Sequence, residues 1–219
     1  HLAEQGLPDI EFTKIRQFFD HPKFVVEMAA AVTEVWGQVP EEKKESTRML
    51  FTAHSVPVAH DNVGGVEGDK NLYSRQVAEA SRLVASQAGI SDYDLVWQSR
   101  SGNPRTPWLE PDIVDHTTDI HHNEGIDTVV VCPIGFISDH MEVIWDLDSE
   151  LQKAADEMGV KVLRTRTAGP TPRFAEMVVD LIDELEQGRE WETSGSVTVQ
   201  GCTVNGAPCA AGCCDIWSR

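Results

Sequence analysis

The chain has 219 residues, of which 41% are apolar and 25% charged, as is usual for one good-sized globular domain or two small ones. Its formal net charge of −18 at pH 7 argues against nucleic acids and anionic membrane surfaces as partners, because binding them needs a surplus of Lys and Arg. The charge is compatible with a cationic substrate or simply with solubility. The longest apolar run, at 128–137, is about half as long as a membrane-spanning helix and the opening residues lack the features of a signal peptide, so we expect a cytoplasmic protein without a transmembrane segment.

Helices and strands are predicted to alternate along the chain. The predicted strands cover 48–54, 93–98, 128–134 and 160–164. The predicted helices cover 11–36, interrupted near its start at 20–22, then 73–88 closed by Gly89, 112–123, 138–158 ended by Gly159, and 172–187. A Gly-rich loop lies at 61–68 and a Pro-rich loop at 100–111. This alternation predicts an α/β domain, with a parallel sheet flanked by helices, over residues 1–192. After Trp191 the composition changes to Ser, Thr, Gly and Cys, so 193–219 are predicted to form a Cys-rich tail.

Polar residues follow two of the predicted strands, where open parallel sheets bind their ligands. His54 ends the strand over 48–54 and is suited to act as a base near neutral pH. A histidine that merely caps a turn is the alternative at this position.

A row of carboxylates follows the strand over 128–134. Asp139, Glu142, Asp146 and Glu150 are separated by steps of three, four and four residues, which place them near one face of a helix. Steps of four drift by about 40° on an α-helix, so wider π-type turns would align the row better. Stacked carboxylates repel one another without a cation, so the row indicates a divalent cation or a proton relay. The alternative is a solvated acidic helix face, although such a face more often contains Lys or Arg, and the first basic residue here is Lys153.

The same residues carry a resemblance to the ferrochelatases, which insert ferrous iron into porphyrins. Thr-Ala-His-Ser-Val-Pro at 52–57 is similar to their catalytic-histidine motif, and Pro-Ile-Gly-Phe-Ile-Ser-Asp-His-Met-Glu-Val-Ile-Trp-Asp-Leu-Asp at 133–148 to their carboxylate-helix motif. Val-Trp-Gln-Ser-Arg at 96–100 and Pro-Trp-Leu-Glu-Pro at 107–111 fit the family in the same order. The resemblance implies a Rossmann-like, chelatase-type fold, with iron and a porphyrin as substrates.

The resemblance also implies roles for individual residues. His54 would accept the pyrrole protons, and Glu142 would face it across the porphyrin and take part in iron delivery or proton removal. Asp146 and Glu150 would continue the row as a path for hydrated metal or for protons, so the residues implied in metal handling are His54, Glu142, Asp146 and Glu150. Asp139, His140 and Ser55 would support the site, and Trp108 would line the porphyrin pocket.

Only the second half of the family's two-part fold is covered, so the sequence is expected to be partial, to have weak activity or none alone, and to be a monomer at full length. Three other functions stay open: a chelatase for sirohydrochlorin, a non-catalytic porphyrin or haem carrier, and a metal-sensing or storage module centred on the tail. Intact His54 and Glu142 favour the enzyme.

Four cysteines crowd into the tail in a C-x6-C-x3-C-C pattern, at Cys202, Cys209, Cys213 and Cys214. This resembles ferrochelatases that carry a 2Fe–2S cluster on three tail cysteines and one earlier Cys, which here would lie upstream of His1. A zinc site and a redox-labile tail are the alternatives. Cys132, in a predicted buried strand, is expected to act as a small apolar side chain. A Cys-rich tail suggests an actinobacterial type, for which coproporphyrin III is the favoured substrate and protoporphyrin IX the next.

Overall fold

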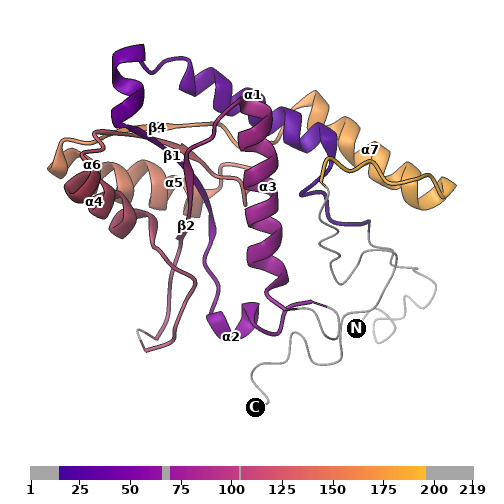
Figure 1. The fold of residues 1–219 in the computed structure, drawn as a ribbon. Helices are drawn as coiled ribbons and strands as arrows, with labels where there is room; N and C mark the ends of the chain where they lie inside the picture. The colour runs from indigo at the N-terminus through magenta and orange to yellow at the C-terminus, as the bar shows by residue number, and fades with distance from the viewer. Residues whose placement is uncertain (1–14, 66–69, 104, 196–219) are drawn as a thin grey trace.

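The computed structural model describes residues 15–65, 70–103 and 105–195, which form a parallel sheet covered by helices on both faces (Figure 1). The strands are β1 (Thr47–His54), β2 (Tyr93–Gln98), β3 (Thr128–Cys132) and β4 (Lys161–Arg164). They lie in the order β2-β1-β3-β4, and each neighbouring pair is parallel. The predicted α/β class is therefore confirmed, and all four strands end at one edge of the sheet.

Two apolar cores lie on the two faces of the sheet. On one face Phe51 of β1 packs with α1 (Pro22–Trp36) and α3 (Leu72–Ala88). On the other face Leu50 packs with α4 (Ile113–Glu124) and with a long helix after β3. Successive residues of β1 thus enter different cores, which explains why this strand is a continuous apolar run.

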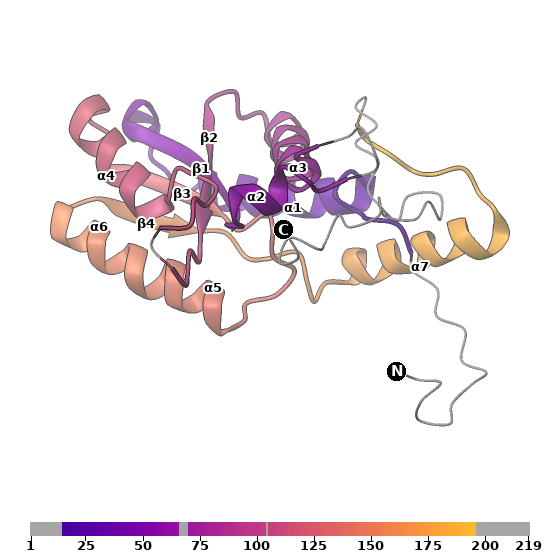
Figure 2. The ribbon, with the colours of Figure 1, turned by 90° about the horizontal axis from the view of Figure 1, so that it is seen from below.

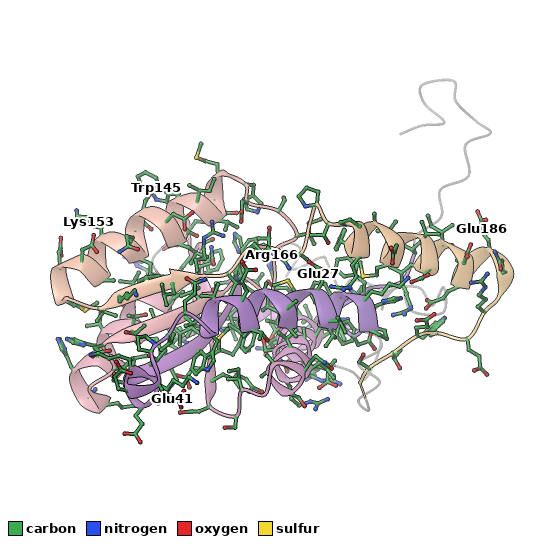
Figure 3. The ribbon with its side chains drawn as sticks, turned by 90° about the horizontal axis from the view of Figure 1, so that it is seen from above. Glu27, Glu41, Trp145, Lys153, Arg166 and Glu186 are labelled. Carbon is green, nitrogen blue, oxygen red and sulfur yellow. The ribbon has the colours of Figure 1, made fainter. Side chains whose placement is uncertain are left out.

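The long helix after β3 has three parts. It comprises α5 (Met141–Trp145), a π-helix (Asp146–Leu151) and α6 (Gln152–Met158). Figure 3 shows Trp145 and Lys153 on its outer side. The wider turns that would align the carboxylates are therefore present at the positions where the acidic row runs.

The last long helix, α7 (Pro172–Gln187), lies along α1 and extends beyond the sheet (Figure 2). Its first turn is fastened to α1 by Glu27, which is buried and accepts hydrogen bonds from Arg173 at 2.7 Å and from Arg166 at 2.5 Å (Figure 3). The remaining elements described are a 3-10 helix (Glu41–Ser46) and the short α2 (Val58–Asp61).

Several predicted boundaries are wrong for identifiable reasons. The first helix begins at Pro22 rather than in the preceding stretch, because His21 has extended backbone and its Nδ1 accepts the Lys23 amide as an N-cap. The helix after β3 begins at Met141 rather than Ser138, so Asp139 does not belong to the helical row. In contrast, Gly89 ends its predicted helix in the left-handed conformation as expected.

The stretch after α7 returns to the coil that precedes α1. Arg16 donates to both carboxylate oxygens of Glu184, at 2.5 and 2.9 Å, and to the Glu192 carbonyl at 2.8 Å. The Ser194 amide donates to the carbonyl of Asp20 at 2.8 Å. Within the described ranges, no helix combines the length and the apolar character needed to cross a membrane.

Candidate active site

His54 closes β1 at the edge where the four strands end. Its Nδ1 makes a short contact with the carbonyl oxygen of Ser55, and since a carbonyl can only accept, Nδ1 carries the proton. In the neutral ring Nε2 is then the free lone pair. The backbone here is held by the Tyr73 hydroxyl, which donates to the His54 carbonyl at 2.7 Å, and by Ser55, which donates to the Leu109 carbonyl at 2.9 Å.

Glu142 lies in the first turn of α5, and its Oε1 is 3.3 Å from His54 Nε2. Two lone pairs at this separation require a proton or a cation between them. With metal–ligand bonds of about 2.1 Å, both atoms could bind one ion at an angle of roughly 100°. The pair can thus exchange a proton for a metal ion without a large movement.

The resemblance implied that Glu142 faces His54 across the porphyrin. In the conformation described, the two side chains contact each other directly at 3.3 Å, and their arrangement around a porphyrin stays a prediction.

Asp146 opens the π-helix, one turn after Glu142, and is held by the end of β2. Its Oδ2 accepts from the Gln98 amide at 3.1 Å and from the Ser99 hydroxyl in a shorter contact. Thr52 of β1 donates to the other end of the Gln98 side chain at 3.1 Å, which orients the amide. Ser99 adopts a left-handed φ of 67°, a conformation unusual outside glycine that clusters at functional sites.

The other predicted site residues occupy different surroundings. Glu150 is exposed on the π-helix, and His140 is exposed in the loop before α5, with its ring against Phe136. Asp139 lies in the same loop and pairs with Arg164, so the structure places it beside the row rather than in it. Trp108 pairs with Pro57 in an isolated antiparallel bridge, next to the histidine motif, and its buried Nε1 has no hydrogen-bond partner among the described residues.

Sequence reasoning missed Tyr73, Gln98, Ser99 and Arg164. Gln98 and Ser99 lie within the motif at 96–100, where Gln98 ends a predicted strand and Ser99 directly follows it, so the signal for them was present. Tyr73 and Arg164 carried no sequence signal, since their partners are set by the packing of α3 and β4.

A second group of possible metal donors lies away from this edge, at His21, Asp180 and Glu192. Lys23 already contacts Asp180 Oδ2 at 2.6 Å, and His21 uses Nδ1 to accept the Lys23 amide. In its neutral form the His21 ring then carries its proton on Nε2, so it is not a ready ligand there.

Cys132 is fully buried in β3, and burial raises the pKa of its thiol to about 12. It is therefore unsuited to supply a thiolate to a metal, in agreement with its expected apolar role. The tail cysteines, Cys202, Cys209, Cys213 and Cys214, lie outside the described residues.

Several known proteins are similar to this chain over most of its length. The family model described as ferrochelatase matches residues 1–186. A coproporphyrin III ferrochelatase of Corynebacterium glutamicum (strain R) is 54% identical over 214 residues, covering 98% of this chain and 57% of that protein. One of Nocardia farcinica is 51% identical over 203 residues, covering 92% of this chain and 57% of that protein.

Among solved structures, a multi-domain protein of Deinococcus radiodurans described as structurally similar to chelatases superposes with a TM-score of 0.44 at 13% identity, covering 87% of this chain and 38% of that one. The chain spans somewhat more than half the length of the curated relatives it matches, at 57% for both of those named above. By the family match and the identity to these relatives, the chain belongs to the ferrochelatase family.

Proposed function

We propose that this chain carries the catalytic residues of an enzyme that inserts ferrous iron into a porphyrin during haem synthesis. The observation that carries the proposal is the contact of 3.3 Å between His54 Nε2 and Glu142 Oε1 at the carboxyl edge of the sheet. Metal insertion needs a base that accepts the pyrrole protons and a carboxylate that handles the metal ion or protons, and this contact brings the two groups together.

The reaction exchanges one Fe²⁺ for two protons. A free-base porphyrin carries two pyrrole N–H groups, and both protons leave as four Fe–N bonds form, so the product is the neutral iron porphyrin and two H⁺. His54 Nε2 accepts the pyrrole protons, since Nδ1 is committed to the Ser55 carbonyl. Glu142 delivers iron or removes protons next to it.

Asp146 and Glu150 form the path for hydrated Fe²⁺ or for departing protons. Carboxylate oxygens are suitable ligands for hydrated divalent cations. Asp146 is fixed by Gln98 and Ser99, so it remains in place while an ion passes. Ser55 supports His54, and His140 supports Glu142.

The favoured porphyrin is coproporphyrin III, the substrate named for both relatives described above, and protoporphyrin IX is the next candidate. An apolar surface beside the pair suits a flat macrocycle: Met141 and Trp145 flank Glu142 along the helix and are 76% and 57% exposed. Trp108 lines the other side of the pocket. The upstream half of the family's fold, which the 57% coverage of the relatives leaves out, would close the pocket over residues 1–192 of this chain.

The Cys-rich tail at 193–219 is proposed to bind a 2Fe–2S cluster, through three of Cys202, Cys209, Cys213 and Cys214 and one upstream cysteine. Thiolates select soft metals and iron–sulfur clusters, which is the chemistry this donor set supports. Such a cluster would supply one-electron redox chemistry. Anaerobic purification followed by iron and sulfide analysis of the wild type and a Cys202→Ser, Cys209→Ser variant tests this part separately.

The central test is anaerobic Fe²⁺ insertion into coproporphyrin III and protoporphyrin IX, followed by absorbance. The 219-residue chain is compared with the same chain joined to the upstream half of the Corynebacterium glutamicum relative. Turnover in the joined form, with preference for coproporphyrin III, is expected. Tight porphyrin binding without turnover in both forms would overturn the proposal in favour of a porphyrin carrier.

His54→Ala in the joined form is expected to abolish metallation while porphyrin binding persists. His122→Ala is the matched control, because His122 lies at the end of α4 against His121 rather than at the pair. Unchanged turnover in His54→Ala would refute the role of this base.

A further inference from the structure

Arg164, the last residue of β4, binds both sides of the segment that carries Glu142. Its Nε and Nη2 donate to the two oxygens of Asp148 at 2.6 and 2.9 Å, a bidentate arrangement. Its Nη1 donates to Asp139 at 2.9 Å and to the Thr165 carbonyl at 3.3 Å. One guanidinium therefore joins the loop before α5 to the middle of the π-helix.

The position of Asp148 makes this contact important for geometry. Asp148 lies within the π-helix, two residues after Asp146 and two before Glu150. π-Turns are rare and usually single, so a stretch of them requires stabilisation from outside the helix. The bidentate contact supplies an external anchor in the stretch where the helix departs from α geometry.

The charge of this segment also requires a partner. Between 139 and 150 there are five carboxylates and no Lys or Arg, at Asp139, Glu142, Asp146, Asp148 and Glu150. Arg164 neutralises two of them, and neither is one of those proposed to handle iron. Although burial alone would lower the pKa of Arg164, its hydrogen bonds and proximity to Asp148 and Asp139 raise it, so the guanidinium stays charged.

We propose that Arg164 is a positioning residue for metal insertion. It fixes the start of α5 and the π-helix relative to β4, so that Glu142 meets His54 and Asp146 meets Gln98 and Ser99. It touches none of the reacting atoms. This inference rests on the proposed function, since it assigns Arg164 to the same site.

The test compares Arg164→Gln, Arg164→Lys and Arg48→Gln in the joined form described above. Arg48 is a matched control, because it lies at the opposite end of the sheet and pairs with three carboxylates, Asp92, Asp94 and Glu124, where Arg164 pairs with two, and its side chain is similarly buried. Both glutamine variants lose a partly buried guanidinium, so a general loss of stability would affect them alike.

Arg164→Gln is expected to lower kcat by about 10- to 100-fold and to raise the KM for Fe²⁺, with the Kd for the porphyrin unchanged, because a displacement of about 1 Å has effects of this size. Arg164→Lys is expected to recover only part of the loss, since an ammonium cannot bind two carboxylates in a fork. Arg48→Gln should lower the melting temperature and leave kcat and both substrate constants unchanged.

An Arg164→Gln variant with unaltered kcat and iron KM would overturn the inference, as would an equal kinetic loss in Arg48→Gln. If Arg164→Gln does not fold, Asp148→Asn replaces it, with the same expected split between the iron and porphyrin constants. If the unmutated protein inserts no iron, the proposed function fails instead. Amide hydrogen exchange over 141–151 then still decides whether Arg164 holds this segment, with faster exchange expected in Arg164→Gln and not in Arg48→Gln.

Discussion

Gly135 is the point at which the loop after β3 crosses β1, and its replacement by alanine should displace the candidate active site. A Cβ on Gly135 would lie 2.5 Å from the Cβ and 2.9 Å from the Cα of Ala53, the residue before His54. The Gly135 amide also donates to the Thr52 carbonyl at 3.2 Å. Both neighbours belong to a central strand, so they cannot move away as the end of a flexible side chain can.

The size of the effect follows from these distances. Ordinary van der Waals contact begins near 3.4 Å, so the loop must move by about 1 Å from β1. Overpacking of this kind costs about 1–3 kcal/mol of folding stability. A displacement of about 1 Å at the loop that leads to Glu142 should lower kcat by roughly 100-fold.

Denaturant unfolding and steady-state iron insertion measure the two effects for Gly135→Ala. Gly64→Ala is the control, because its Cβ would meet its nearest neighbour at an ordinary 3.4 Å. Adding Ala53→Gly removes the closest contact and leaves the one at 2.9 Å, so it should restore part of the activity. Wild-type stability and turnover in Gly135→Ala would show that the proximity of loop and strand does not set the site geometry.

Three further outcomes follow from the structure. Cys132 should resist alkylation at pH 8 until the chain unfolds, because a pKa of about 12 instead of 9.0 lowers its thiolate fraction about 1,000-fold. Mass spectrometry of iodoacetamide-treated protein measures the alkylation of Cys132. Tyr73→Phe should lower stability by about 1 kcal/mol in denaturant unfolding, because the His54 carbonyl loses the hydroxyl at 2.7 Å. Glu184→Gln should cost about 2 kcal/mol at pH 7, because it removes one of the two carboxylates that pair with the buried guanidinium of Arg16 and leaves only Asp20 at 3.2 Å. Burial alone would raise the pKa of Glu184, but hydrogen bonds and charge from Arg16 bring it below 4.5. This stabilisation is therefore present above pH 4.5 and is lost as the pH falls through the lower folded value, so the unfolding curves of the wild type and Glu184→Gln should converge at acidic pH below that value.

Local sequence patterns predicted the strands and most helices because each element obeys its own periodicity. The run at 128–134 identified β3, although Pro133 ends the strand at Cys132 by removing a backbone donor. The spacing of Glu142, Asp146 and Glu150 predicted that wider turns would align them, and the π-helix confirms this. These features depend on neighbours within a few residues.

The failures involve partners distant in sequence. Asp139 was placed in the helical row because its spacing fits, but its contact with Arg164 keeps it in the loop, and Ser138 to His140 stay outside the helix. Similarly, the predicted helix over 11–36 extended upstream of Pro22, while the coil there is fixed by Arg16 through its contacts with Glu184 of α7 and with the carbonyl of Glu192. No periodicity within a segment can reveal a partner that the sheet brings to it.

The order of the strands explains how such separate segments form one site. Each of the four adjacent strand ends supplies one group: Gln98 from β2, His54 from β1, the loop to Glu142 after β3, and Arg164 from β4. The helix from Met141 to Leu151 contacts three of these ends, through Glu142 with His54, Asp146 with Gln98 and Asp148 with Arg164. The sheet therefore sets where His54 lies relative to Glu142 and Asp146, so the proposed path for iron depends on Gln98 and Arg164 as well as on the residues proposed to meet the metal.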